Sequence, residues 1–182
     1  MTIVVTEYLR DALFTGAWFG LMTMVWCGWA QEGPPRRWPL WLGIGSGLGM
    51  VIAVVFGIMV WRTWDSPSAL EGRYHWFGVL VAGEVLAAGL GAWYLLRRRQ
   101  GRWVAWWVAV VVALHFLPLA ALLQTPLLSL IGVVQLVGLI ALLPRLRRRE
   151  GPTSALVGVL MGCTLLASGI IIGIPAFAEA VT

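Results

Sequence analysis

Long apolar runs alternate with short polar connections along nearly the whole chain. An apolar run of roughly 18 residues or more is typical of a helix that crosses a bilayer, because about 20 residues at 1.5 Å each span the hydrocarbon core. The runs between charged and turn residues predict six such helices. They cover about residues 12–30, 38–61, 75–96, 103–123, 127–143 and 154–178.

The stretch from Val104 to Pro144 has no charged residue and is too long for one crossing. As a single helix it would extend roughly 60 Å, about twice the thickness of the hydrocarbon core. Residues 124–126, "QTP", predict the turn, because Pro126 removes a backbone donor and disfavours helix at Thr125. We therefore expect an all-α, polytopic integral membrane bundle of six transmembrane helices, forming a single domain over residues 1–182.

The arginines predict how this bundle lies in the membrane. All 13 basic residues are Arg, and ten of them lie in or beside the connections 31–38, 97–102 and 145–153. Arginine-rich loops favour the cytoplasmic side. We expect these three connections to be cytoplasmic in the inner or plasma membrane, with both termini on the outer face.

Tryptophans cluster near both ends of the expected helices. An amphipathic indole ring is well suited to the head-group region, so we interpret these residues as interfacial anchors and not as a cofactor cage. They are Trp29, Trp38, Trp41, Trp93, Trp103, Trp106 and Trp107 at the arginine side, and Trp61, Trp64 and Trp76 at the other.

Composition excludes several function classes. Hydrophobic residues make up 60% of the chain and charged residues 12%, about half the share that is usual in soluble domains. The absence of Lys excludes a lysine Schiff base or a phosphate-loop lysine. Cys27 and Cys163 belong to different spans and to no metal-binding motif. We expect no cofactor, no metal and no nucleic-acid partner; the lipid bilayer is the expected environment.

Pairs of glycines four residues apart predict close helix packing, since small residues let the backbones of membrane helices approach. This packing serves either the bundle itself, a homodimer or a larger membrane complex. The glycines concerned are Gly43, Gly45, Gly47, Gly49, Gly158, Gly162, Gly169 and Gly173.

Two weaker patterns concern loops and symmetry. Ser68 followed by Glu71 has the spacing of a capping box and predicts a short interfacial helix before the third span. Six spans also permit two inverted three-helix halves, 12–96 and 103–178, although no residue match between them supports a repeat.

Three polar residues lie at one depth in successive spans. Glu84 and His115 are each 15.5 residues from the centre of the hairpin between Arg99 and Gln100, so antiparallel helices would place them at the same level. Gln135 lies nine residues past Pro126, again roughly 13 Å below the outer end at 1.5 Å per residue. We expect Glu84, His115 and Gln135 to form a site for a substrate or proton, because acids within a membrane generally have a functional role.

Pro118 lies three residues after His115 and predicts a helix kink, because its ring cannot pack against the carbonyl of Leu114. The neighbouring sequence "HFLPLA" resembles small, uncharacterised multi-span bacterial membrane proteins, a resemblance that implies no activity.

The leading functional interpretation is a proton-coupled transporter of a small molecule or ion, or a membrane-embedded binding protein. The alternative is a non-catalytic accessory or assembly subunit that docks on another membrane protein through its glycine-rich helix faces. An enzyme is the least favoured class, because zinc catalysis needs about three ligands and no nucleophile motif is present.

Overall fold

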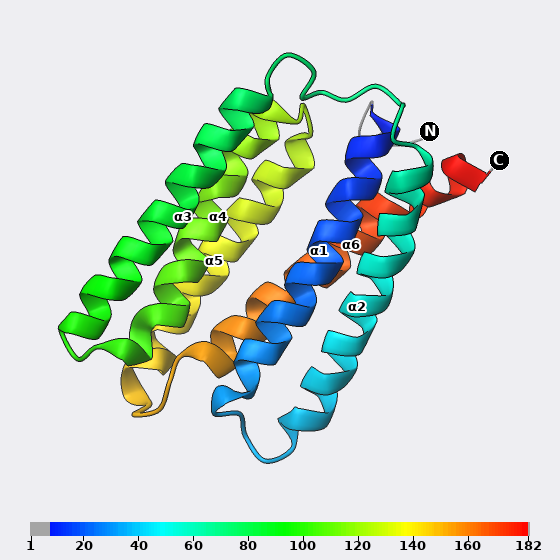
Figure 1. The fold of residues 1–182 in the computed structure, drawn as a ribbon. Helices are drawn as coiled ribbons and strands as arrows, with labels where there is room; N and C mark the ends of the chain where they lie inside the picture. Colours follow the sequence, from blue (N-terminus) through cyan, green and yellow to red (C-terminus); the bar gives the residue numbers. More distant parts are fainter. Residues whose placement is uncertain (1–7, 182) are drawn as a thin grey trace.

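The computed structural model describes residues 8–181, which form six long helices and two short 3-10 helices (Figure 1). All six long helices are long and apolar enough to cross a membrane, as predicted. The long helices are α1 Leu9–Trp29, α2 Trp38–Arg62, α3 Tyr74–Arg97, α4 Val104–Leu122, α5 Pro126–Arg148 and α6 Ser154–Val181. The 3-10 helices are η1 Ala30–Glu32 and η2 Gly101–Trp103.

Prolines do not end the helices in which they lie. The sequence predicts a fifth helix that stops at residue 143, whereas α5 continues through Pro144 to Arg148. A proline removes one backbone hydrogen bond, and the bonds on either side of it are enough to continue the helix. Pro118 likewise lies inside the continuous helix α4, where the Leu114 carbonyl has no amide donor four residues later. The kink at Pro118 stays a prediction.

The helices form two groups of three (Figure 1). One group contains α1, α2 and α6, with α6 running obliquely behind α1, and the other contains α4 between α3 and α5. Contacts of α6 with α4 and α5 join the groups, and the Phe19 and Phe116 rings meet edge to face across them at 5.5 Å. The grouping differs from a division into the first and last three helices. Helix α6 packs against α1 as α3 packs against α4, so each group takes helices from both halves of the chain, and the inverted relation of the halves stays a prediction.

Glycines bring α1 and α2 together at a close crossing. A Cβ atom built on Gly49 would lie 2.5 Å from the carbonyl oxygen of Gly20, and one on Gly20 would lie 2.7 Å from that of Gly49. Only the absence of a side chain at both positions permits this approach. By contrast, no neighbouring side chain or helix in the described part of the chain comes within 4 Å of such a Cβ position on Gly43 or Gly47, so neither lies at a helix contact there.

The remaining predicted packing glycines lie in the same three-helix group. Gly158 faces the backbone of Trp26, and Gly45 and Gly162 face the sulfur of Cys27 from opposite helices. Gly169 and Gly173 lie against Phe19 and Phe56 respectively. Six of the eight predicted glycines are therefore enclosed between α1, α2 and α6.

Helix α3 is the least buried of the six long helices. None of its residues is buried, and it packs extensively against α4 alone. Gly78, Gly83 and Gly89 have open space beside them among the described residues. One face of α3 is therefore held by the bundle, and the rest is an apolar outer surface.

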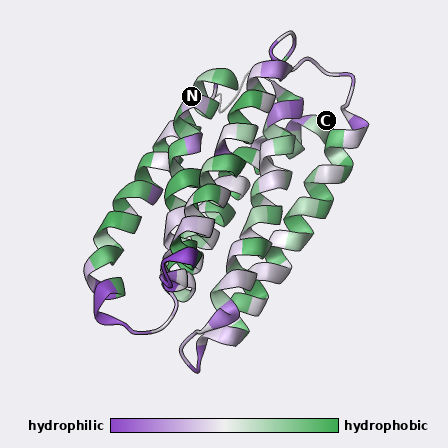
Figure 2. Ribbon diagram, turned by 60° about the vertical axis from the view of Figure 1, so that its left-hand side comes forward, coloured by the Kyte–Doolittle hydropathy of each residue, from purple (hydrophilic) through white to green (hydrophobic). Residues whose placement is uncertain are grey.

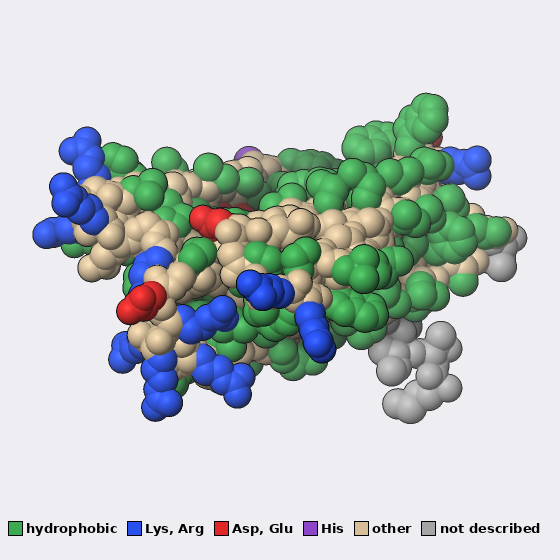
Figure 3. All heavy atoms as spheres, turned by 90° about the horizontal axis from the view of Figure 1, so that it is seen from below, with side chains coloured by type: hydrophobic (Ala, Val, Ile, Leu, Met, Phe, Trp, Pro, Cys, Tyr) green, Lys and Arg blue, Asp and Glu red, His purple; other side chains and the backbone are tan. Residues whose placement is uncertain are grey.

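Polar residues gather at the two ends of the bundle, with an apolar middle (Figure 2). The connections 30–37, 98–103 and 149–153 lie at one end, where arginine side chains form the blue clusters of Figure 3. The loop 63–73 lies at the other end, together with the start of α1 and the end of α6. This separation of basic and non-basic ends agrees with the pattern on which the predicted orientation rests.

The loop 63–73 is made of turns and contains no helix, contrary to the prediction from the Ser68 and Glu71 spacing. Glu71 nonetheless accepts a hydrogen bond from the Ser68 amide at 3.1 Å, as in a capping box. Asp11 of α1, which is buried, accepts a hydrogen bond from the Ala69 amide at 2.7 Å. Because this bond fixes the loop from outside, its short turns stay in place without a helix of their own.

Candidate functional site

The structure brings Glu84 and His115 together where α3 and α4 pack side by side. Oε2 of Glu84 lies 3.3 Å from Nδ1 of His115. The two helices are antiparallel and joined by a short connection, so equal distances from its centre put both residues at the same depth. The site therefore contains two of the three residues predicted from depth alone.

An interhelical hydrogen bond one turn away fixes the register of α3 on α4. Nε1 of Trp107 donates to the carbonyl oxygen of Ala87 at 3.1 Å. Gly91 leaves room for the same indole, since a Cβ there would lie 1.9 Å from Nε1. A side chain at residue 91 would displace the indole and with it the alignment of Glu84 with His115.

The contact between the pair suits charge attraction better than a neutral hydrogen bond. Nδ1 of His115 is buried and has no well-aligned hydrogen-bond partner among the described residues, although the carboxylate oxygen is within ion-pair distance. When His115 is protonated, the two groups attract each other across 3.3 Å; when it is neutral, this geometry leaves Nδ1 poorly bonded. The contact is therefore an ion pair only when the pair holds a proton on the imidazole and none on the carboxyl.

The side chains of Glu84 and His115 differ in exposure. The side chain of Glu84 is 22% exposed and that of His115 9% exposed. Glu84 lies on the helix that has the least cover, whereas His115 belongs to a helix packed on both sides. Access to the pair from outside the bundle is thus through the carboxylate of Glu84.

Gln135 bonds to a different helix, α6. It is fully buried, and its Nε2 donates to Oγ1 of Thr164 on α6 at 2.9 Å. Its Oε1 has no hydrogen-bond donor among the described residues. No hydrogen bond or ion pair in the described chain joins Gln135 to Glu84 or His115, so the expected three-residue site is reduced to a pair.

Four threonine and serine hydroxyls of α1 and α6 donate hydrogen bonds within their own helices. Thr15 and Thr23 donate to carbonyl oxygens four residues earlier, as do Thr164 and Ser168 in α6. Such bonds inside a helix leave these hydroxyls engaged. Gln135, by contrast, keeps a buried acceptor, Oε1, without a donor among the described residues.

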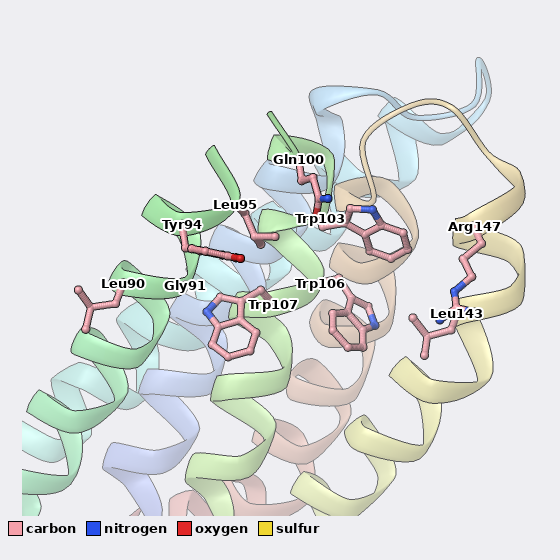
Figure 4. Close-up of a pocket in the computed structure, with 10 residues that line it drawn as sticks. All are labelled: Leu90, Gly91, Tyr94, Leu95, Gln100, Trp103, Trp106, Trp107, Leu143 and Arg147. Atoms are coloured by element: carbon pink, nitrogen blue, oxygen red, sulfur yellow. The ribbon is translucent and has the colours of Figure 1, made fainter. Parts of the chain in front are cut away.

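A groove at the arginine end was not predicted from the sequence (Figure 4). It encloses about 650 Å³ between α3, α4 and α5, with the rings of Trp106 and Trp107 between the other two helices. A second cavity of about 120 Å³ lies at the opposite end beside Asp11. Neither Glu84 nor His115 lines either cavity.

The contacts by which Arg10 and Asp11 hold the loop 63–73 were also not predicted from the sequence. Arg10 donates to the Trp64 carbonyl oxygen and to the Tyr74 hydroxyl, and its guanidinium stacks over the Trp64 ring. The sequence carried a sign of it, namely two opposite charges in the first turn of an apolar helix. For the groove the sign was weaker, because indoles at a membrane boundary have a sufficient explanation as anchors.

In comparisons with known proteins, no family model, no curated protein and no solved structure matches the chain. No group of three or more His, Cys, Asp or Glu residues in 8–181 is placed to hold a metal ion. Interpretation of the site therefore depends on the geometry of the Glu84 and His115 pair.

Proposed function

We propose that the chain is an integral membrane protein that crosses the bilayer six times, with its arginine-rich end in the cytoplasm. Ten of 13 arginines belong to that end, and the opposite end is diluted by acids. Both termini and the loop 63–73 then face outward. The cell membrane is the location that this distribution favours.

We further propose that the Glu84 and His115 pair is the proton-binding site of a transporter or membrane-embedded binding protein. The observation that carries this proposal is the 3.3 Å contact between carboxylate and imidazole inside the apolar spans. An imidazole changes its charge near neutral pH more readily than any other side chain. A carboxylate beside it supplies the opposite charge and a second place for the proton.

Coupling follows from the different charge states of the pair. With one proton on His115 and none on Glu84, the two charges attract and hold α3 against α4. A second proton, on Glu84, ends the attraction, and loss of the first proton leaves an unpaired carboxylate. Because α3 packs extensively only against α4, either change weakens the attachment of that helix. Movement of α3 is the proposed link between proton binding and access to substrate.

Infrared spectroscopy of the reconstituted full-length protein tests this proposal. The protonated carboxyl of Glu84 has a carbonyl stretch that the carboxylate lacks, so a pH titration should show one carboxyl band that is absent in Glu84→Gln. His115→Gln should shift the titration of that band, whereas Glu150→Gln, in the exposed loop at the arginine end, should leave it unchanged. A band that persists in Glu84→Gln would remove the basis of the proposal.

An accessory or assembly subunit is the second candidate, favoured by the lack of cover on α3. Its open glycines, and Gly43 and Gly47 of α2, are among the small-residue positions that remain free for another helix. Gly83→Leu leaves this chain's packing intact and would block such a partner. A protein that stays monomeric in lipid nanodiscs, and behaves identically as Gly83→Leu, argues against docking at this face.

A further inference from the structure

The groove at the arginine end has the form of a ligand site. Its volume of about 650 Å³ falls within the range of roughly 300–1,000 Å³ that is usual for small-molecule sites. Helices α3 and α5 form its walls, and both pack on α4, which forms its floor. The lining residues are Leu90, Gly91, Tyr94, Leu95, Gln100, Trp103, Trp106, Trp107, Leu143 and Arg147.

The polar and apolar parts of the groove are separated. Gln100 and Trp103 lie at the mouth, beside the α3–α4 connection, and Leu90 lies deeper (Figure 4). Leu90 is seven residues before Arg97, which corresponds to a depth of about 10 Å along α3. A ligand that follows the groove is therefore polar at one end and apolar at the other.

Two of the indoles are oriented by bonds to neighbouring helices. Nε1 of Trp107 donates to the Ala87 carbonyl oxygen, and Nε1 of Trp106 donates to that of Leu139 at 3.3 Å. Their donors are thus used, and the ring faces remain as apolar surface. The lower part of the groove favours a hydrocarbon chain and offers little to a polar molecule.

Arg147 supplies the charge. It is exposed, lines the groove, and forms no hydrogen bond or ion pair within the described part of the chain. The Tyr94 hydroxyl points into the groove from the opposite wall in Figure 4. Together they present a guanidinium, beside Leu143, and a hydroxyl on facing walls of the aromatic slot in Figure 4, and a guanidinium suits a phosphate group.

We propose that this groove binds one anionic phospholipid, with its phosphate at Arg147 and an acyl chain along Trp106 and Trp107. The surrounding arginine-rich end favours negative charge, and basic pockets between membrane helices are suited to anionic head groups. The inference relies on the proposed membrane location and is independent of the Glu84 and His115 pair, which lies outside the groove.

Native mass spectrometry of the full-length protein, titrated with phosphatidylglycerol or phosphatidylcholine, tests the site. The first phosphatidylglycerol should bind more tightly than phosphatidylcholine, and Arg147→Gln should weaken its binding tenfold or more, the effect of losing one hydrogen bond to a charged group. Leu143→Trp should abolish the first binding event by filling the groove. Arg148→Gln removes the same charge one residue along and should leave binding within about twofold of the wild type, as that factor is under 0.5 kcal/mol.

Each arm can overturn the proposal. Equal binding of the two lipids, or equal loss in Arg147→Gln and Arg148→Gln, would mean a non-specific lipid layer. Inorganic phosphate that competes with phosphatidylglycerol at millimolar concentration would assign the site to free phosphate. Glu84→Gln should retain full lipid binding, so a failure of the transport proposal and a failure of this one give different results.

Discussion

Replacing Gly49 by alanine adds one methyl group at the closest crossing of α1 and α2. The new Cβ would lie 2.5 Å from the carbonyl oxygen of Gly20 and 2.9 Å from the amide nitrogen of Met24. Both are backbone atoms of a packed helix, so neither can rotate away as a flexible side chain would. The two helices must move apart, and overpacking of this kind typically costs about 1–3 kcal/mol.

Gly47→Ala is a matched control on the same helix. The substitution is identical and lies two residues away, yet no neighbouring side chain or helix in the described part of the chain comes within 4 Å of the new Cβ. Alanine favours helix over glycine by up to about 1 kcal/mol, and both variants share that contribution. We therefore expect Gly49→Ala to be less stable than Gly47→Ala by about 1–3 kcal/mol, the overpacking cost.

Reversible unfolding in mixed micelles of mild detergent and dodecyl sulfate, followed by circular dichroism, measures this difference. Gly47→Ala should match the wild type or exceed it slightly. Equal free energies of unfolding for the two variants would refute the assignment of Gly49 to the helix crossing and Gly47 to the free surface.

Three further predictions concern polar side chains. In a double-mutant cycle of Glu84→Gln and His115→Ala, unfolding free energies should show a coupling of about 0.6–1.7 kcal/mol, the span from average to strongest for hydrogen bonds between membrane helices; additive effects would mean no interaction. Asp11→Ala should speed hydrogen exchange of the Ala69 amide by tenfold or more, given about 1.5–3 kcal/mol for a bond to a charged group. Unchanged exchange would contradict the hydrogen bond from Ala69 to Asp11. Gln135→Leu removes the bond to Thr164 but also a buried oxygen without a donor, so thermal stability should change by less than about 1 kcal/mol, and a larger fall would reveal a donor to Oε1 that the structure lacks.

The shared depth of Glu84 and His115 could be predicted, and the face that each polar residue occupies could not. Glu84 and His115 meet, as their equal distances from the centre of the α3–α4 connection predicted. Gln135 was chosen by a similar count of residues from a turn, yet it bonds to Thr164 of α6. Depth depends on the number of residues from a turn, whereas facing depends on how each helix is rotated against its neighbours.

The glycines of α2 likewise show that the rotation of a helix decides which of its residues pack. Gly47 and Gly49 belong to one motif and have equal standing as packing residues in the sequence. Only Gly49 lies at the crossing with α1. A rotation of α2 about its own axis exchanges one for the other, and nothing local to the motif sets that rotation.

The sequence by itself determined that six apolar helices form and where their basic connections lie. Those features depend on run length and charge, which a bilayer selects whatever the neighbouring helices do. The tertiary structure alone decided that α6 joins α1 and α2, that α3 stays uncovered, and that the indoles of α4 form a groove. Helices that are apolar on all sides have no polar face to show which side packs inward, so close steric fit between them makes that choice.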